Sequence, residues 1–386
     1  MKRIAVLVHS TNPRGGVVHG MQLAEALCDA GHQATLIAPD VSGQGFFREP
    51  RCAVLTIPAK RETDVATMVS RRIHEISAFL EQPTTGSFDI HHAQDPIGAN
   101  ALADLVGKRR IPGFVRTVHH LDRFHDPRLA AWQLRGMRAA ERVCVVSRLW
   151  QDRLRHDHGV RATIVGNGVE TERFTPRPDA HDAAVRARLG LSPDESGPVI
   201  LALGGIEPRK NTLGTLQAFL RLARSHPDAM LVIAGGATLL DHRAYRERFD
   251  AALAQLGTAD RVIVAGIMPD EQMPALYRIA DMLAFPSLEE GFGLCVLEAM
   301  ACGRPVIVSD IAPFTEYLRP DDALWASPNE PDSILMAMLE ALDPNVRNRL
   351  GDTGPKRAAS FGWNRVAMAH LPVYAALNRI MELNHA

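Results

Sequence analysis

The sequence predicts an α/β protein built from two Rossmann-like, doubly wound domains that face a cleft. Three observations lead to this fold class. The chain opens with an apolar strand, a helical pattern and a second apolar strand, which form a βαβ unit of about 35 residues. The same alternation starts again in the second half of the chain. The length of 386 residues, with 46% of them hydrophobic, suits two domains that each bury a core.

In the first half, strands are expected where short apolar runs stand between helical patterns or loops. The first strand covers residues 3–8, and the helical pattern that follows it ends at Gly31. The next strand, at residues 34–38, is expected to pair with the first in parallel, because a helix joins the two. Further strands are expected at residues 54–57, around Ile90, at 114–118 and at 143–146.

The second half begins after a polar, charged segment at residues 176–198, which opens with two prolines and is typical of a linker or insertion. We therefore expect a first domain at residues 1–175 and a second at 176–362, with ligand bound outside the carboxyl ends of the strands. Residues 363 to about 381 have a helical pattern. The strands of the second domain are expected at residues 199–203, 230–234, 261–264, 282–285, 306–308 and 323–325.

The composition excludes several classes of function. A formal net charge of −1 is unlike the broad positive surface of a nucleic-acid-binding protein. The five cysteines lack the paired C-x-x-C spacing of a zinc or redox site, so we expect reduced thiols. No apolar run has the length of a secretory signal or a transmembrane helix. These features predict a soluble cytoplasmic protein.

Residues 289–303, with the sequence EEGFGLCVLEAMACG, place two carboxylates eight positions apart around a glycine-containing loop. A helical pattern begins near Leu294, so Glu298 lies just over one turn inside the helix and Glu290 lies in the loop before it. The N–H groups near Gly293 and Leu294 stand at a helix N-terminus, where partial positive charge favours a phosphate. One carboxylate suits ribose hydroxyls and the other a sugar hydroxyl. The alternative is an amphipathic helix with solvated glutamates.

A second segment, GGIEPRKN at residues 204–211, follows an expected strand and precedes an expected helix. It places the two cations Arg209 and Lys210 at the mouth of the expected cleft. Together they can neutralise a diphosphate, although an exposed charged loop is the alternative.

Taken together, these segments resemble the retaining glycosyltransferases of the group-4 family, which have the GT-B fold and carry an E-x7-E motif followed by EAMACG. The resemblance covers nearly the whole chain, from about residue 3 to residue 363. It implies that the C-terminal helix, residues 363–386, crosses back and packs on the first domain. It also implies a nucleoside diphosphate sugar as donor, held mainly by the second domain, and a small-molecule, lipid or glycan acceptor brought by the first.

The resemblance also assigns residues by position. Lys210 matches the lysine of a G-R-x-x-P-x-K segment that grips the leaving pyrophosphate. Gly205 occupies the position where that segment has its arginine, so a grip by two cations requires Arg209 to compensate. Gly15 and Gly16 match the glycine loop through which the backbone of the first domain approaches the donor phosphate or the acceptor, with a plain tight turn as the alternative.

In the same way, His119 matches the histidine of a T-x-H segment that the family places beside the reacting sugar. The adjacent His120 is its rival. Metal binding by this histidine cluster is disfavoured, because neither zinc-like spacing nor an H-E-x-x-H helix is present. Gln94 stands at the second histidine of a D-x-x-H-x-H segment, which we interpret as structural. Ile267 would meet the nucleotide base through backbone atoms.

The expected reaction is a transfer that needs no metal ion and no cofactor. Fixed cations and helix-end N–H groups can stabilise the charge on a leaving phosphate, and no D-x-D pair occurs in the chain. Retention is implied by the resemblance, with Glu290 and His119 beside the reacting sugar and the leaving phosphate taking the acceptor proton.

Two alternatives stay open. One is a catalytically silent nucleotide-sugar binder, which the glycine at position 205 suggests. The other is a hydrolase or epimerase on the same scaffold, with a base from residues 119–126. A nicotinamide oxidoreductase is disfavoured by the lack of a G-x-G-x-x-G segment. The sequence predicts neither the donor base nor the sugar, the acceptor or the oligomeric state.

Overall fold

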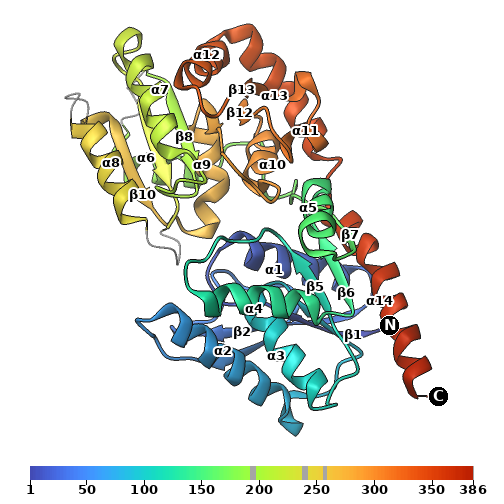
Figure 1. Ribbon diagram of the computed structural model, residues 1–386. Helices are drawn as coiled ribbons and strands as arrows, with labels where there is room; N and C mark the ends of the chain where they lie inside the picture. Colours follow the sequence, from blue (N-terminus) through green and yellow to red (C-terminus); the bar gives the residue numbers. More distant parts are fainter. Residues whose placement is uncertain (192–196, 237–241, 255–258, 386) are drawn as a thin grey trace. The chain divides into compact units, whose positions relative to one another are not determined.

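The computed structural model describes residues 1–191, 197–236, 242–254 and 259–385 (Figure 1). The chain forms two compact units. The first consists of Met1–Asn167 together with Trp363–Ala386, and the second consists of Gly168–Gly362. Each unit has its own sheet and its own core.

The border between the units falls after Asn167, earlier than the border after residue 175 that the sequence suggests. The reason is local packing of the segment that follows. The N–H of Val169 donates to the carbonyl of Phe361 at 2.8 Å, and Arg173 forms an ion pair of 2.7 Å with Asp270. These contacts attach residues 168–175 to the second unit.

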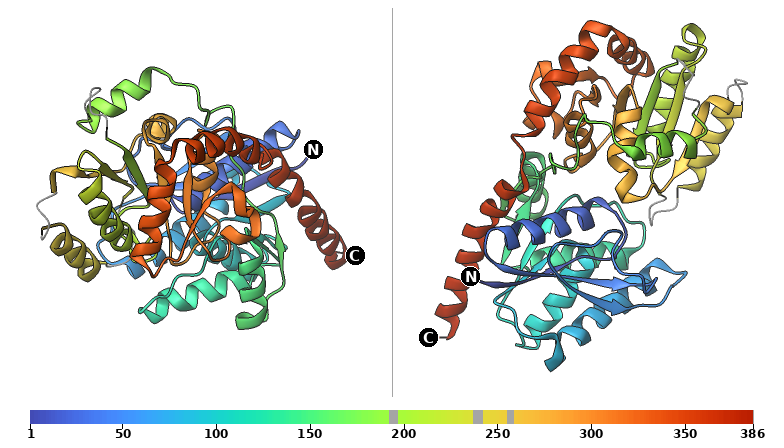
Figure 2. Two further views of the ribbon diagram at one scale, coloured as in Figure 1. Left: turned by 90° about the horizontal axis from the view of Figure 1, so that it is seen from above. Right: turned by 180° about the vertical axis from the view of Figure 1, so that it is seen from behind.

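The sheet of the first unit has seven parallel strands in the order β3-β2-β1-β4-β5-β6-β7. Helices α1 and α14 pack against each other on one face, and α2, α3 and α4 lie together on the other (Figures 1 and 2). The strands are β1 (Arg3–Leu7), β2 (Gln33–Asp40), β3 (Ala53–Pro58), β4 (Ile90–Ala93), β5 (Val115–Val118), β6 (Arg142–Val145) and β7 (Ala162–Ile164). The helices are α1 (Gly15–Asp29), α2 (Val65–Leu80), α3 (Pro96–Gly107), α4 (Pro127–Arg138), α5 (Arg148–His158) and α14 (Trp363–His385).

The sheet of the second unit has six parallel strands in the order β10-β9-β8-β11-β12-β13. The strands are β8 (Val199–Leu203), β9 (Met230–Ala234), β10 (Val262–Gly266), β11 (Met282–Phe285), β12 (Val306–Ser309) and β13 (Leu324–Ala326). The helices are α6 (Ala180–Arg188), α7 (Thr212–Ser225), α8 (Arg243–Ala254), α9 (Met273–Ile279), α10 (Leu294–Ala301), α11 (Phe314–Tyr317), α12 (Pro331–Leu342) and α13 (Pro344–Ala358).

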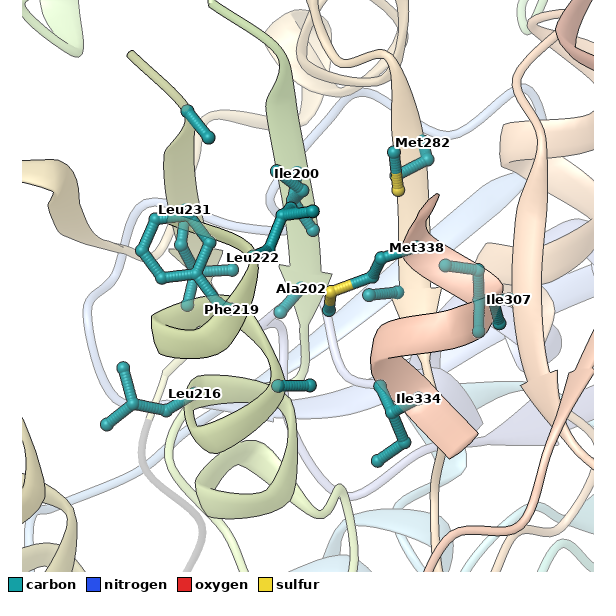
Figure 3. Close-up of a cluster of buried hydrophobic side chains, with 14 of the residues drawn as sticks. Ile200, Ala202, Leu216, Phe219, Leu222, Leu231, Met282, Ile307, Ile334 and Met338 are labelled. Carbon is teal, nitrogen blue, oxygen red and sulfur yellow. The ribbon is translucent and has the colours of Figure 1, made fainter. Parts of the chain in front are cut away.

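The core of the second unit forms where α7 and α12 cover one face of the sheet (Figure 3). Phe219 of α7 and Met338 of α12 are fully enclosed and lie over strand residues such as Ile200 and Ile307. Burying each such side chain contributes about 1.5–3 kcal/mol. This packing fixes the strands and therefore the loops that leave their carboxyl ends.

The fold class predicted from the sequence is confirmed, and each expected strand overlaps an observed one. Strand β7 was not predicted, because its three residues are partly exposed at the sheet edge and give no apolar run. The expected linker at 176–198 contains helix α6, and its residues 192–196 lie outside the described part of the chain. Among the described helices, none combines the length and the hydrophobicity needed to cross a membrane.

Candidate functional site

The strand order of the second unit reverses between β8 and β11, which are neighbours in the sheet. The loops that leave the carboxyl ends of these two strands diverge toward opposite sides, and such a switch point is where open parallel sheets bind ligands. Residues 204–211 follow β8, and residues 286–293 follow β11. Both segments singled out in the sequence therefore lie at one point of the sheet edge.

The buried carboxylate of Glu290 is the centre of this site. Its Oε1 accepts hydrogen bonds from Arg209 Nη1 at 2.7 Å and from Lys210 Nζ at 2.6 Å. Arg209 also lies 3.9 Å from Glu207, whose carboxyl pKa is raised by burial. The ammonium of Lys210 stands 4.3 Å from the ring centroid of Phe285, a cation–π distance. Three residues predicted from two separate segments thus form one charged cluster.

Glycine residues form the surface beneath this cluster. The N–H groups of Gly204 and Gly205 both donate to the carbonyl of Ala234, at 2.9 and 3.2 Å. Gly205 has a φ of 77°, and a Cβ there would lie 2.9 Å from the carbonyl oxygen of Gly236. An arginine at position 205 would strain this backbone, which gives a physical reason for the departure from the family segment.

The stem of Lys210 lies directly on this glycine surface. A Cβ at Gly204 would lie 2.6 Å from Cε of Lys210. Gly204 therefore leaves the space through which the lysine side chain reaches Glu290. The cluster therefore requires a residue without a side chain at position 204.

Helix α10 begins at Leu294, where the sequence predicts it. The residue before it, Gly293, has a φ of 93°, and a Cβ there would lie 2.9 Å from the ring of Phe314. The preceding Phe292 stacks on Tyr317 with ring centroids 4.3 Å apart, and the Tyr317 hydroxyl donates to the Phe292 carbonyl at 3.1 Å. Aromatic packing and glycine conformation together fix the start of the helix.

Glu298 lies on α10 with a partner of its own. The hydroxyl of Tyr277, in α9, donates to its Oε2 at 2.6 Å. Burial raises the pKa of Glu298 to about 7, while the bond from Tyr277 and the charge of Arg173 oppose this rise. The two carboxylates of the E-x7-E motif thus have different local environments, one paired with cations and the other with a phenol.

Cys295, in the first turn of α10, connects the two environments. Burial raises the pKa of its thiol, and the charges of Lys210, Glu298 and Glu290 all act on it. Lys210 and both carboxylates of the motif are therefore close enough to this thiol to act on its pKa.

Ile267 follows β10 and is 63% exposed. Its Cδ1 would lie 2.8 Å from a Cβ at Gly236, and the carbonyl of Gly266 accepts from the N–H of Gly235 at 2.7 Å. Ile267 therefore lies beside the same glycine loop that supports Gly205.

In the first unit, the predicted residues His119 and Gly16 lie together. A Cβ at Gly16 would lie 3.3 Å from Cδ2 of His119, whereas one at Gly15 would meet no atom within 4 Å. His120, the rival histidine, is half-exposed and points to Asp122, with 3.3 Å between Nε2 and Oδ1. His119 is thus the histidine that faces the glycine loop at the start of α1.

His119 is the outer end of a hydrogen-bonded chain that the sequence did not predict. Its Nε2 lies 3.1 Å from Oε1 of Gln94, and Nε2 of Gln94 lies 3.3 Å from Nε2 of His92. Nδ1 of His92 lies 2.9 Å from the hydroxyl of Tyr374, in α14. With Gln94 oriented in this way, His119 carries its proton on Nε2 and donates it to the amide oxygen.

Two further buried histidines surround this chain. The ring of His19 lies 4.7 Å from that of His119, and Nδ1 of His19 lies 2.6 Å from Oδ1 of Asn167. His370 of α14 stands 5.3 Å from His92. Burial lowers the pKa of His19 to about 4 and that of His370 to about 3, so both rings are neutral at pH 7. No spacing in the sequence links His19 with His370, whose rings lie 6.2 Å apart because α14 packs against α1.

A metal site does not arise from this cluster within the described residues. No group of three or more His, Cys, Asp or Glu side chains there has an arrangement that could hold a metal ion.

Two family models match the chain, one in each half. The model of Glycosyltransferase Family 4 matches residues 13–173, and the model of Glycosyl transferases group 1 matches residues 187–357. The D-inositol 3-phosphate glycosyltransferase of Acidothermus cellulolyticus is 34% identical over 219 residues, which are 55% of this chain and 48% of that protein. The chain spans about half the length of the curated relatives of this type.

Solved structures agree over nearly the full chain. Sucrose-phosphate synthase from Thermosynechococcus elongatus has a TM-score of 0.78 at 21% identity, covering 98% of this chain and 99% of its own. An Anabaena protein solved in complex with UDP-glucose has a TM-score of 0.76 at 17% identity, covering 97% of this chain and 100% of its own. At these identities the likeness shows the fold. With a family model matched in each half and this fold, the chain belongs to the family 4 glycosyltransferases of the GT-B fold.

Proposed function

We propose that this protein transfers a sugar from a nucleoside diphosphate sugar to an acceptor hydroxyl, with retention at the anomeric carbon and without a metal ion. The observation that supports this most is the cluster of Glu290 with Arg209 and Lys210 at the carboxyl edge of the second sheet. Cations beside a buried carboxylate suit a ligand that brings an anionic diphosphate and sugar hydroxyls together. The name of the Acidothermus relative supports glycosyl transfer, and the UDP-glucose complex of the Anabaena protein supports a donor of this class.

The diphosphate would lie against the cations of the second unit. Lys210 and Arg209 would exchange part of their contact with Glu290 for phosphate oxygens. The N–H groups at Gly293 and Leu294, where α10 begins, would contact a phosphate or the sugar edge. Glu290 would then accept a hydrogen bond from a sugar hydroxyl.

The nucleoside would extend toward the other end of the site. Glu298 would accept hydrogen bonds from the ribose hydroxyls. The backbone at Ile267 would contact the base, since this residue lies beside Gly236, in the loop that contacts Gly205.

In the reaction, the bond from the anomeric carbon to the phosphate oxygen breaks, and a bond from that carbon to the acceptor oxygen forms on the same face. The acceptor proton passes to the leaving phosphate. Lys210 and Arg209 stabilise the charge that develops on the diphosphate. His119 and Gly16 belong to the first unit, where we place the acceptor.

The charge of the site supports an active enzyme better than a catalytically silent nucleotide-sugar binder. The glycine at position 205 removes one cation relative to the family segment. Arg209 nevertheless stands beside Lys210, so the cluster keeps two cations within reach of Glu290. This arrangement favours an active enzyme.

Release of nucleoside diphosphate from UDP-, GDP- and ADP-sugars tests the proposal when it is measured with and without a panel of hydroxyl acceptors. We expect release that depends on an acceptor and that EDTA leaves unchanged. Lys210→Met should reduce kcat at least about tenfold, because it removes a charge-assisted contact of about 1.5–3 kcal/mol. The exposed Lys356, in α13 of the same unit, provides the matched control Lys356→Met with wild-type turnover.

The other outcomes identify the alternatives. Release that needs no acceptor would indicate a hydrolase, and binding without any release would indicate a silent binder. Activity that EDTA abolishes and manganese restores would contradict the metal-free mechanism. An inverted anomeric configuration in the product, read from its NMR coupling constant, would contradict retention.

A further inference from the structure

Tyr277 is the residue that holds Glu298 in its observed position. It is fully enclosed, with 0% of its surface exposed, and it lies in α9, which packs against α10. Its ring meets Phe174 edge to face at 5.8 Å. A ring held on all sides gives its hydroxyl one fixed position, and that hydroxyl donates to Oε2 of Glu298 at 2.6 Å.

This bond makes the two oxygens of Glu298 different. Oε2 is bound to the phenol, whereas among the described residues no hydrogen bond to Oε1 occurs. The side chain is half-buried, and Oε1 is not among the enclosed polar atoms that lack a partner. One oxygen is therefore anchored inside the protein and the other can meet a ligand. A glutamate that is already ordered loses less side-chain entropy when the ligand binds.

The charged residues around Glu298 do not hold its carboxylate in place of the Tyr277 hydroxyl. Arg173, the nearby cation, forms ion pairs with Asp270 at 2.7 Å and with Glu170 at 3.6 Å. Both of those acids repel the charge of Glu298. The phenol of Tyr277 is the group that supports the carboxylate directly.

We propose that Tyr277 is a positioning residue whose hydroxyl fixes one oxygen of Glu298 and directs the other toward the ribose hydroxyls of a nucleoside diphosphate. The inference rests on the proposed function, because it takes Glu298 as the ribose-binding carboxylate. Tyr277 lies outside the E-x7-E motif, twenty-one residues before Glu298.

The role has a signature in the pH dependence of nucleotide binding. The groups that face Glu298 are Tyr277 from α9, Cys295 from the first turn of α10, Cys302 just after α10, Asp270 from the turn before α9, and Glu170 and Arg173 from the segment before α6. Burial raises the pKa of Glu298 to about 7, and the phenol favours the charged form. Nucleotide affinity should therefore rise with pH through about 7. Removing the phenol should move this midpoint to higher pH.

Tyr277→Phe tests the proposal, because it removes one hydroxyl and keeps the ring packing. The probe is whichever of UDP, GDP and ADP the wild-type full chain binds most tightly, titrated by calorimetry from pH 6 to 9. We expect affinity about tenfold lower at pH 7, the size of one hydrogen bond to a charged group, and a midpoint at higher pH. The KM for the donor should rise more than kcat falls.

Tyr245→Phe is the matched control. It removes another buried tyrosine hydroxyl of the second unit, which accepts from the N–H of Leu213 at 2.8 Å and does not contact Glu298. Its nucleotide affinity and pH midpoint should equal those of the wild type. As a second arm, 3-fluorotyrosine at position 277 keeps the packing and strengthens the phenol as a donor, so the midpoint should move to lower pH.

The outcomes separate this inference from the proposed function. If Glu298→Ala weakens nucleotide binding while Tyr277→Phe and the fluorotyrosine protein keep the wild-type affinity and midpoint, the positioning role is wrong and the proposed function stands. If the wild type binds no nucleotide, or Glu298→Ala binds as well as the wild type, the proposed function fails first.

Discussion

Glu290 affects both of the roles proposed for the donor site. It is proposed to bind the donor sugar, and it occupies the cations that are proposed to bind the diphosphate. In the structure its Oε1 accepts from both Arg209 and Lys210. A diphosphate that binds these cations must share them with the carboxylate or displace it. Because a buried charge requires partners, the two cations also stabilise the buried carboxylate.

Replacing Glu290 should therefore separate binding from transfer. Glu290→Gln is expected to bind the free nucleoside diphosphate several-fold more tightly, since a neutral amide competes less for the cations. Transfer should slow at least about tenfold, because a contact to the sugar of about 1.5–3 kcal/mol is lost. Calorimetry and initial rates measure the two effects, with Glu247→Gln on the exposed face of α8 as the control. Weaker nucleotide binding in Glu290→Gln would show that the carboxylate does not compete.

The sequence predicted part of this arrangement. Arg209, Lys210 and Glu290 come together because loops after neighbouring parallel strands share one edge of the sheet, and that edge follows from the strand pattern. Tyr277 could not be predicted, since its role depends on the packing of α9 against α10 rather than on any spacing. His119 was singled out by its motif, but its chain through Gln94 was not.

At the scale of elements, the loop after β8 depends on glycines that lie in contact with the loop after β9. A Cβ at Gly235 would lie 2.6 Å from the backbone nitrogen of Gly205. The close approach of these two loops forms the surface on which the stem of Lys210 lies. The close approach of the two loops therefore requires glycine at position 205. Arg209 supplies the second cation of the cluster.

This account predicts the cost of a side chain at position 205. Gly205→Ala should lower the free energy of unfolding by about 1–3 kcal/mol, from the positive φ and from the contact with Gly236. Gly190→Ala is the matched control, because Gly190 has a similar φ of 68° but no atom within 4 Å of its added Cβ. Urea denaturation should show a larger loss for Gly205→Ala. An equal or smaller loss would contradict the close approach of the two loops.

The elements themselves followed well from the sequence where burial is high. Strands such as β8 and β11 are apolar throughout and were predicted with their observed bounds. Strand β7 was missed because its residues are half-exposed and it forms only three pairs with β6. The position of α6 inside an expected linker was also missed, since a short charged helix has the same composition as a loop.

At the scale of the whole molecule, the chain returns to its first unit through α14. Tyr374 of this helix bonds His92, and Trp363 packs against His19 at 5.2 Å. The last segment of the chain therefore supports the histidines that lead to His119. The resemblance predicted a returning helix, but the residues through which it acts are visible only in the structure.

The most direct test of the account is the affinity of the full chain for UDP, GDP and ADP, measured by calorimetry for the wild type and for Glu298→Ala. We predict that the wild type binds at least one of these nucleotides. The variant should bind it more weakly by about 1.5–3 kcal/mol, roughly 10- to 150-fold, because the ribose hydroxyls lose a charged acceptor. Equal affinity in the two proteins, or no binding by the wild type, would contradict a donor site in the second unit.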